Sequence, residues 1–556
     1  MTKKEYEILA DLLYPNALDT SFYFDRYKKR NVEGVVTRLA PSPTGYLHIG
    51  QLYQALIHYM LAKKTNGIYY MRLEDTDGKR EVENAGDIAY NMLARFGLLP
   101  SEGYFGDKLK ESGEYGPYVQ SKRIEIYNSF AHELVKRGRA YPCFCKNTDG
   151  IEEIKKKREE ELEESDNLTL HDPCRDLSLE EVKKNLNDGK PFALRLLSTG
   201  DVEKTHPFTD LIKGKKDLRE NGKDDVLIKS NGIPVYAFAH VVDDTLMGTT
   251  TIVRGQEWYQ SLPVHIELSR AFGFEPFKYA HTPNICVVDE KTGTKRKISK
   301  RKDSFADVRF FLKKGYPVTA VIEYLLNLLN SDFEIWRKNN PSLPYTEFPF
   351  DIKKIGVTNP MFDFLKLNDI SKTIISRMTA EEVYNNALEN AKEWREEDVK
   401  PLTENKDVLI KVLSIDRGGD RPRKDITTYG EILSLYDYVL PNFKSQFNVA
   451  DLGSVNKADA VKFLETYQKS YTECADNTAW FENLKTIALS HNFVDNKTYK
   501  QNPTAYSGNV ADASKFVRIA ITGKTNSPDL FSIMKILGVT ECKNRLNNLI
   551  DELKKN

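Results

Sequence analysis

A strand, a turn rich in proline and glycine and a helix follow one another between Val35 and Tyr59. The β-branched run VVTRL predicts the strand, and the turn LAPSPTGYLHIGQ continues to Gln51. After the turn, apolar residues recur at helical spacing, and the run GIYYMRL from Gly67 predicts a second strand. Parallel strands joined by a crossover helix are typical of α/β folds, so this stretch predicts an α/β domain.

The composition is that of a soluble globular protein with several domains. The chain has 556 residues, too many for one ordinary core, and 40% of them are hydrophobic and 29% charged. Its longest apolar runs, such as Ala320–Leu329, fall short of the roughly 20 residues that span a bilayer, and no export signal is evident. We therefore expect no membrane contact and a cytoplasmic location.

The charges balance over the whole chain. Lysine plus arginine and aspartate plus glutamate both number 81, which gives a formal net charge of zero. This balance disfavours a protein that coats nucleic acid indiscriminately, because such binding depends on neutralising phosphates. Local basic patches remain, and the plainest is KTGTKRKISKRKD from Lys291 to Asp303. Six cysteines in so long a chain do not make a disulfide scaffold.

Changes in pattern along the chain predict five parts. The sequence pattern is again that of strands at PFALRLL, GIPVYAFAHVVDD, TTIVRG and ICVVDE, whereas helical patterns dominate after Tyr316. Residues 151–167 are almost wholly charged and predict a solvated helix or a mobile arm. The predicted parts are an N-terminal extension rich in turn formers (1–33), the first half of a Rossmann-like α/β domain (34–115), an inserted domain (116–215), the second half of the α/β domain (216–325) and an all-α region (326–556).

The turn before the first helix has the features of an anion site. A helix that begins near His48 leaves backbone N–H groups unpaired and carries a partial positive charge at its start. Gly45 and Gly50 would let a phosphate approach the backbone, and His48 can donate a hydrogen bond to it. Taken alone, the stretch is more typical of a tight strand-to-helix turn with a surface histidine.

The second candidate is the loop KRKISKRKD, Lys295–Asp303. Lysines on a loop can fold onto a triphosphate and stabilise the charge that develops as pyrophosphate departs. The alternative is a solvated basic run or a nucleic-acid patch. Found together in this order, PSPTGYLHIG and KISKR resemble the paired ATP-binding motifs of class I aminoacyl-tRNA synthetases. This resemblance implies ATP with Mg²⁺, catalytic roles for His48 and Lys300, and ATP contacts from Pro41, Thr44, Gly45, His48, Gly50, Lys297, Ser299, Lys300 and Arg301.

Further stretches indicate which amino acid is activated. RLEDTDGKR, GPYVQSKRIEIY, YAFAHVVDD and TTIVRGQEW resemble the glutamyl-tRNA synthetase family. The resemblance implies that glutamate is bound by Arg38, Ser42, Glu74, Tyr236 and Arg254, with Glu74 on the ammonium group. The arginines suit this task, because their rigid fork matches a carboxylate. Two positions depart from the pattern: Gln51 stands where the class has a second histidine, and Ala237 stands where the family often has a polar residue.

Three cysteines raise a metal question. Cys143, Cys145 and Cys174 of HDPC resemble the zinc knuckle that some glutamyl enzymes carry in the inserted domain. Tetrahedral zinc needs a fourth ligand, which His171 or Asp176 would supply. The alternative is that no metal binds and the cysteines are remnants of a lost site.

The family resemblance implies a two-step reaction. Glutamate attacks the α-phosphate of Mg-ATP to give glutamyl-adenylate, and a terminal ribose hydroxyl of tRNA(Glu) then takes the glutamyl group. The inserted domain would hold the tRNA acceptor end and the all-α region would read the anticodon; we expect a monomer. The alternatives are a glutaminyl-tRNA synthetase, disfavoured by the helical second half, a truncated glutamyl-queuosine relative, disfavoured by length, and a noncatalytic tRNA-binding relative.

Overall fold

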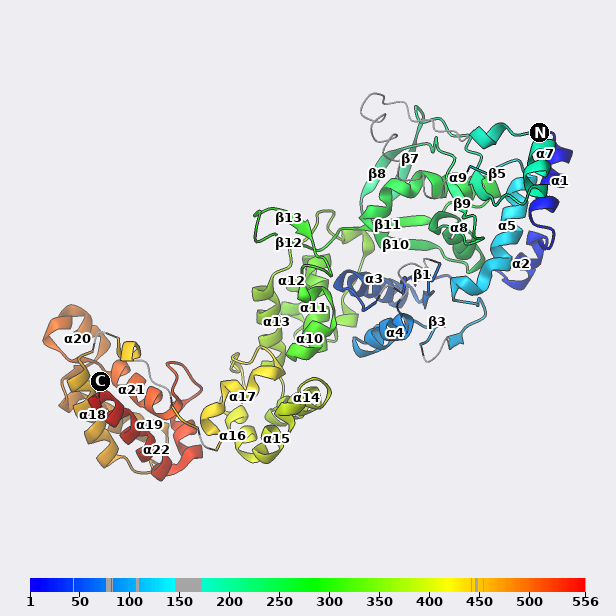
Figure 1. The fold of residues 1–556 in the computed structure, drawn as a ribbon. Coiled ribbons are helices and arrows are strands. Elements are labelled where there is room, and N and C mark those ends of the chain that lie inside the picture. The colour runs from blue at the N-terminus through cyan, green and yellow to red at the C-terminus, as the bar shows by residue number, and fades with distance from the viewer. Residues whose placement is uncertain are drawn as a thin grey trace. The chain divides into compact units, whose positions relative to one another are not determined.

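The computed structural model describes residues 1–43, 45–76, 82, 84–106, 110–145, 173–441, 443–445, 449–453 and 455–555. Over these ranges the chain forms two compact units, Met1–Phe310 with Ile322–Phe362, and Phe311–Val321 with Asp363–Asn556 (Figure 1). The charged segment 151–167 lies outside the described residues.

A parallel sheet forms the centre of the first unit. β1 (Val36–Leu39), β2 (Ile68–Met71) and β3 (Glu102–Tyr104) are parallel neighbours, and the short β4 (Glu111–Ser112) pairs antiparallel with β3. β10 (Thr251–Gly255) and β11 (Lys278–Thr282) form a second parallel pair. The Thr250 N–H donates to the Val36 carbonyl over 2.9 Å, which places the start of β10 beside β1.

Helices make the crossovers of this sheet. α3 (Ile49–Thr65) links β1 to β2 and packs on β1, β2 and β10; α4 (Ala85–Arg95) links β2 to β3, and α9 (Leu262–Phe272) links β10 to β11. α3 ends at Asn66, whose left-handed conformation stops the helix, as the sequence predicts. This is the Rossmann-like arrangement predicted for the α/β domain, and ligands of such sheets bind at the carboxyl ends of the strands.

Between β4 and β10 the chain forms further strands and helices that do not belong to the parallel sheet. β5 (Ala140–Cys143), β6 (Ala193–Leu196) and β9 (Val226–Ile228) form an antiparallel sheet, and β7 (Thr205–Asp210) pairs with β8 (Gly214–Arg219). α5 (Ile124–Lys136), the 3-10 turn Pro173–Asp176 and α7 (Leu179–Asn187) accompany them.

The stretch GIPVYAFAHVVDD was predicted to be strand-like, and this prediction was wrong. Residues Tyr236–Leu246 form the helix α8. The run is rich in β-branched and aromatic residues, but almost every side chain from Phe238 to Asp244 is buried, whichever face of the helix it occupies. A short run that is apolar on all sides does not distinguish a buried strand from a buried helix.

The first 33 residues are more ordered than their sequence suggests. They form α1 (Lys3–Leu13) and α2 (Thr20–Arg26), which pack on α5. Leu9, Ala10 and Tyr23 are buried in the same hydrophobic cluster as Phe130 of α5. The extension is therefore part of the core of the first unit.

Past β11 the chain forms the hairpin β12 (Cys286–Val288) and β13 (Lys295–Lys297), the 3-10 turn Ser304–Ala306, and the helices α10 (Arg309–Lys314), α11 (Val318–Leu329) and α12 (Asp332–Asn339). The chain after Tyr316 was predicted to be helical, and most of its described elements are helices.

The second unit is built from helices around one buried cluster that runs from Ile375 to Leu553. Besides most of α10 and the start of α11, it contains α13 (Phe364–Ser376), α14 (Ala380–Trp394), α15 (Glu396–Glu404), α16 (Lys406–Ser414), α17 (Ile432–Leu435), α18 (Lys457–Ser470), α19 (Asn477–Ser490), α20 (Asn496–Gln501), α21 (Val510–Thr522) and α22 (Leu530–Lys555). Gly538, with φ of 80°, interrupts α22. A two-residue parallel pair, β14 (Phe493–Val494) and β15 (Gly508–Asn509), is added to the predicted all-α pattern.

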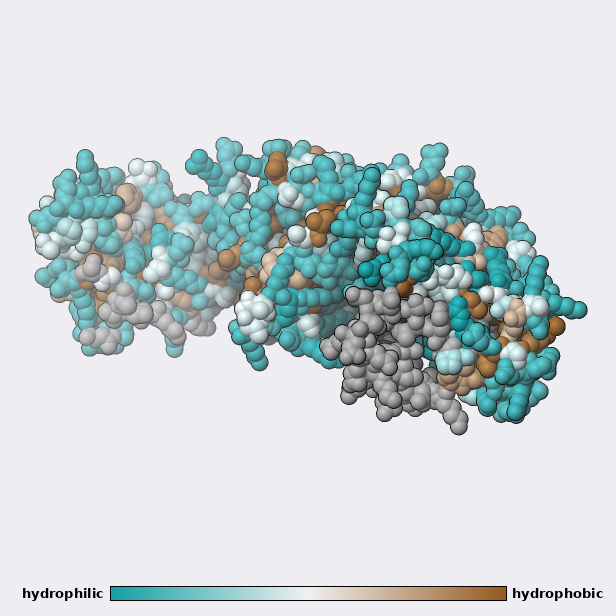
Figure 2. Space-filling model, turned by 90° about the horizontal axis from the view of Figure 1, so that it is seen from above, coloured by the Kyte–Doolittle hydropathy of each residue, from teal (hydrophilic) through white to brown (hydrophobic). Residues whose placement is uncertain are grey.

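The surface carries no sign of a membrane-spanning element in the part of the chain that is described, since none of its helices is both long and apolar enough to cross a bilayer. The face presented in Figure 2 is mostly hydrophilic, and hydrophobic residues show through in small groups.

Candidate active site

The proline- and glycine-rich turn leads from β1 into α3 and ends in a reciprocal helix cap. His48 is the N-cap of α3: its Nδ1 accepts from the Gly50 N–H over 2.9 Å, and its own N–H donates to Gln51 Oε1 over 3.0 Å. Gln51, for which the sequence offered no role, thus fixes the cap from the other side. Because Nδ1 of His48 is an acceptor, its neutral ring carries the proton on Nε2.

One arginine fixes the conformation of the basic loop by binding an aspartate on each side of it. Arg296 of β13 donates to Asp289 over 2.7 Å and binds Asp303 bidentately over 2.7 and 2.8 Å. Asp303 also accepts from the Ser299 N–H over 2.8 Å, and Ile298 is buried beneath the loop. The KISKR segment is therefore a closed loop with its lysines outward: Lys297, Lys300 and Arg301 are all exposed.

The loop and the cap meet at one pocket. The Lys300 ammonium donates to the Tyr46 carbonyl over 2.5 Å, and His48 forms an isolated antiparallel bridge with Asp307. A cavity of about 280 Å³ is lined by His48, Gly50, Gln51, Tyr53, Gln54, Glu257, Thr282, Pro283, Asn284, Ile285, Lys297 and Lys300. Two motifs some 250 positions apart in sequence thus line one cavity at the ends of β1 and β11.

Electrostatics keep His48 uncharged. Burial, reinforced by the charges of Lys300 and Lys297, lowers its pKa from 6.5 to about 4. Partial desolvation of its ammonium group also lowers the pKa of Lys300, against the pull of Asp307. Lys297 is paired with Glu257 over 2.9 Å. The pocket therefore presents one neutral imidazole donor and two ammonium groups, a set suited to a polyphosphate.

The other predicted ATP residues lie around this turn. Pro41 is buried and its carbonyl accepts from the Glu74 N–H over 3.1 Å. Gly45 has φ of 113°, a backbone conformation that favours glycine. Ser299 is half-buried in the loop, and Thr44 lies outside the described residues.

A network of buried charges surrounds the carboxyl ends of β1 and β2. Arg38 Nε contacts both oxygens of Asp244 over 3.0 Å, and Arg72 donates to Asp244 over 2.7 Å and to Glu74 over 2.9 Å. His240 also contacts Asp244. Burial would raise the pKa of Asp244, but Arg38 and Arg72 outweigh it and hold the pKa well below its usual range. Glu74 has a raised pKa, because burial outweighs Arg72 and Arg38.

Arg254 differs from the other buried arginines. It is 4% exposed, and its guanidinium donates to His281 Nε2 over 3.0 Å, to His265 Nδ1 over 3.2 Å and to the Trp258 carbonyl over 3.2 Å. All these partners are neutral acceptors, and in the described part of the chain no carboxylate lies within ion-pair distance of it. A buried cation without a compensating anion is costly, so a carboxylate bound to Arg254 would offset that cost.

Tyr236 begins α8 beside this arginine. Its ring stacks on His240 with centroids 5.4 Å apart and lies 4.5 Å from the ring of Trp258. Ser42 is exposed in the turn after β1. Ala237, which departs from the family pattern, packs half-buried against the hydrophobic cluster of α8 and α5.

Sequence reasoning missed several members of the site. Asp244 contacts the predicted Arg38, Arg72 contacts the predicted Glu74, and His265 and His281 contact the predicted Arg254. The acid pair that ends YAFAHVVDD was a usable signal for Asp244, because two acids directly after an apolar run require partners when buried.

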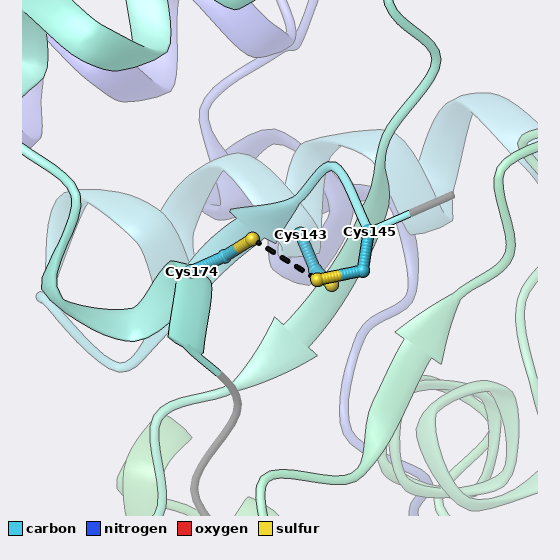
Figure 3. Close-up of side chains that lie close together, drawn as sticks. All are labelled: Cys143, Cys145 and Cys174. Carbon is cyan, nitrogen blue, oxygen red and sulfur yellow. Dashed lines mark hydrogen bonds between the residues drawn. The ribbon is translucent and has the colours of Figure 1, made fainter. Parts of the chain in front are cut away.

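The predicted cysteine cluster is assembled in the inserted part (Figure 3). The Sγ atoms of Cys143, Cys145 and Cys174 lie within 4.8 Å of one another, and those of Cys145 and Cys174 are 3.5 Å apart. The sulfurs come from the end of β5 and from the 3-10 turn Pro173–Asp176. Three thiols at this spacing fit three corners of a tetrahedral zinc site. Asp176 lies in the same turn, whereas His171 is outside the described residues.

A separate pocket lies in the second unit. A cavity of about 520 Å³ is lined by Asn477, Thr478, Trp480, Phe481, Glu482, Ser514, Arg518, Ser527, Pro528, Asp529 and Leu530. It combines an exposed aromatic ring, Phe481, with a guanidinium, Arg518, whose Nη1 donates to the Ser527 and Pro528 carbonyls over 3.2 Å.

Fold, paired motifs and family matches together define a class I aminoacyl-tRNA synthetase. Residues 34–335 match the family described as tRNA synthetases class I (E and Q), catalytic domain, and residues 421–550 match an anticodon binding domain. A solved glutamate tRNA ligase from Elizabethkingia meningosepticum, crystallised with its amino acid, shares the fold with a TM-score of 0.73 at 23% identity, over 94% of this chain and 100% of that one.

Sequence relatives narrow the class to one family. The chain is 41% identical to the glutamate–tRNA ligase of Acetivibrio thermocellus and to that of Clostridium beijerinckii, in each case over 98% of this chain and 100% of the relative. It is 37% identical to that of Sorangium cellulosum over 94% and 96%. The chain belongs to the glutamate–tRNA ligase family.

Proposed function

We propose that this protein attaches L-glutamate to tRNA(Glu) at the expense of ATP, through a glutamyl-adenylate. The observation that carries glutamate as the substrate is Arg254, a buried guanidinium surrounded by neutral acceptors at the end of β10. Thr282, which lines the His48–Lys300 cavity, donates to the Arg254 carbonyl over 3.2 Å, so the two sites adjoin.

In the first step a carboxylate oxygen of glutamate attacks the α-phosphorus of Mg-ATP, and the bond to the bridging oxygen of the departing pyrophosphate breaks. In the second step the ribose hydroxyl at the tRNA end attacks the activated carbonyl, loses its proton and displaces AMP. Neither step needs a protein nucleophile, so the residues act by positioning and by stabilising charge.

The two catalytic roles go to His48 and Lys300. His48, neutral with its proton on Nε2, would donate to a phosphoryl oxygen, and Lys300 would exchange the Tyr46 carbonyl for the phosphate charge. The remaining ATP contacts are assigned to the backbone of the turn and to the closed loop, that is, to Pro41, Thr44, Gly45, Gly50, Lys297, Ser299 and Arg301.

In the proposed glutamate site, Arg254 binds the side-chain carboxylate of glutamate and Tyr236 lines the pocket beside Arg254. Glu74, close to the turn, would take the ammonium group, and Ser42 would contact the amino-acid moiety. Arg38 already binds Asp244 through Nε, so it would reach the substrate with its other nitrogens. Relatives named glutamate–tRNA ligase do not favour the glutaminyl or noncatalytic alternatives.

The cysteine cluster is a candidate structural zinc site. Cys143, Cys145 and Cys174 would hold the ion as thiolates, with Asp176 or His171 as fourth ligand, and the ion would tie the turn before α7 to β5. Metal content of the purified protein tests this: about one zinc per chain that falls in a Cys174→Ser variant supports it, and absence of zinc restores the view that the cysteines are remnants.

tRNA would be engaged by both units. The inserted part would hold the acceptor end, and the cavity at Phe481 and Arg518, inside the anticodon-binding match, would take a splayed base by stacking and hydrogen bonding. A monomeric state and a cytoplasmic location stay predictions.

The reaction itself tests the proposal. Incubating the protein with ATP, labelled glutamate and total tRNA should give an acid-precipitable, alkali-labile glutamyl-tRNA and release AMP and pyrophosphate in equal amounts. Hydrolysis of ATP without label on tRNA would contradict the proposed transfer.

A further inference from the structure

Arg254 is the first of three buried residues, each on a different strand, that form a chain of hydrogen bonds, called the relay below. Arg254 is on β10, His281 is on β11 directly opposite it in the register, and Asp210 ends β7. Their side chains form a chain of hydrogen bonds: Arg254 Nε donates to His281 Nε2 over 3.0 Å, and His281 Nδ1 contacts Asp210 Oδ2 over 2.6 Å. Asp210 and His281 are 1% and 0% exposed.

The hydrogen bonds determine where the imidazole proton resides. Because Nε2 of His281 accepts from a guanidinium, which cannot accept, the proton of the neutral ring is on Nδ1 and is donated to Asp210. Asp210 is fixed in turn by the N–H groups of Ile212 and Lys213, each 2.9 Å away. The carboxylate therefore sets both the tautomer and the orientation of the ring.

The imidazole also separates two charges. A carboxylate bound directly to Arg254 would compensate the cation and compete with a substrate carboxylate. With a neutral ring in between, Asp210 orients the guanidinium without pairing with it. The ring of Tyr279 stacks on His281 with centroids 5.9 Å apart and lies 5.0 Å from the Arg254 guanidinium, so it packs against both groups.

We infer that Asp210 and His281 are positioning residues for glutamate recognition: they hold Arg254 in the orientation that receives the side-chain carboxylate. The inference rests on the proposed function, since it assumes that Arg254 binds glutamate. It adds two buried residues, from outside the motifs that identify the family, to the determinants of amino-acid affinity.

Paired variants of His281 separate positioning from packing. Gln places a carboxamide oxygen near Nε2 and keeps an acceptor for Arg254, whereas Asn places its amide near Nδ1 and loses that acceptor. We expect His281→Asn to raise the KM for glutamate by about 10-fold and His281→Gln to raise it by less than about threefold, each with the KM for ATP within about twofold of the parent. A role in packing alone would affect both variants, and both substrates, alike.

Asp210→Asn provides a second measurement with a matched control. Asp224 is an equally buried carboxylate, bound to Tyr141 and Arg175 away from Arg254. Asp210→Asn should raise the KM for glutamate several-fold, and Asp224→Asn should leave it within about twofold even where it lowers the thermal midpoint.

The outcomes distinguish this inference from the function on which it rests. If the parent protein glutamylates tRNA and the KM for glutamate is unchanged in His281→Asn and Asp210→Asn, the relay has no positioning role and the proposed function stands. If the parent transfers no glutamate to tRNA, the proposed function fails and the inference fails with it.

Discussion

Replacing Arg254 by methionine should strongly weaken glutamate recognition with little effect on folding. The substitution removes the charge but keeps an apolar side chain of similar length. In the structure three donors of Arg254 are used by His281, His265 and Trp258, which leaves N–H groups for two hydrogen bonds to a carboxylate. At about 1.5 kcal/mol or more for each charged hydrogen bond, the loss is roughly 3 kcal/mol, or about 100-fold in kcat/KM for glutamate.

The effect on stability separates Arg254 from Arg38. Removing Arg254 loses hydrogen bonds but also relieves the cost of a buried cation without an anion, so the free energy of unfolding should change by about 1 kcal/mol or less. Arg38→Met leaves Asp244 buried with less compensating charge and should cost roughly 3 kcal/mol.

Initial rates of tRNA glutamylation at varied glutamate and urea unfolding of each variant measure both quantities. An Arg254→Met protein that keeps kcat/KM within a few-fold of the parent, or that unfolds as readily as Arg38→Met, would refute this reasoning. Arg254→Lys should lie between the parent and Arg254→Met, because an ammonium keeps the charge and loses the fork.

Three further results are expected. Lys300→Ala should lower the rate of adenylate formation by about 100-fold with an unchanged thermal midpoint, and unchanged turnover would remove the loop from the mechanism. In the folded protein the pKa of His48 is about 4, below its ordinary 6.5, so the unfolded state binds a proton first as the pH falls. The free energy of unfolding of the parent, relative to that of His48→Gln, should therefore fall by about 2 to 3 kcal/mol between pH 6.5 and 4. A difference that does not change with pH would contradict the lowered pKa. Phe481→Ala should raise the KM for tRNA several-fold and leave the KM values for glutamate and ATP unchanged, whereas equal changes in all three would point to misfolding.

The strand–turn–helix at Val35–Tyr59 was predictable because each local signal agreed with the fold. The β-branched run forms β1, the turn ends at the helix cap of His48, and Asn66 stops α3. α8 was mistaken for a strand because its apolar residues cover the whole helix, so that no periodicity separates the two structures. The two helices of the N-terminal extension escaped notice because each buries only a few residues and gains its order from packing on α5.

The site was predictable only where a residue belongs to a motif. Catalytic roles for His48 and Lys300 were predicted from their motifs and stay predictions, and the structure adds that both residues line one cavity. The partners of Arg254 could not, because His281 and Asp210 stand 27 and 44 positions away on other strands and carry no local pattern. Contacts between side chains distant in sequence depend on strand register and order, which the sequence alone left open.

The central claim, that this protein selects glutamate through an uncompensated buried arginine, is tested most directly by offering glutamate and glutamine at equal concentration with ATP and total tRNA. The account predicts that the parent charges tRNA with glutamate and strongly prefers it to glutamine. The neutral amide of glutamine forms no ion pair with Arg254 and offers it one acceptor oxygen instead of two. Charging with neither amino acid, or an equal or greater rate with glutamine, would contradict it.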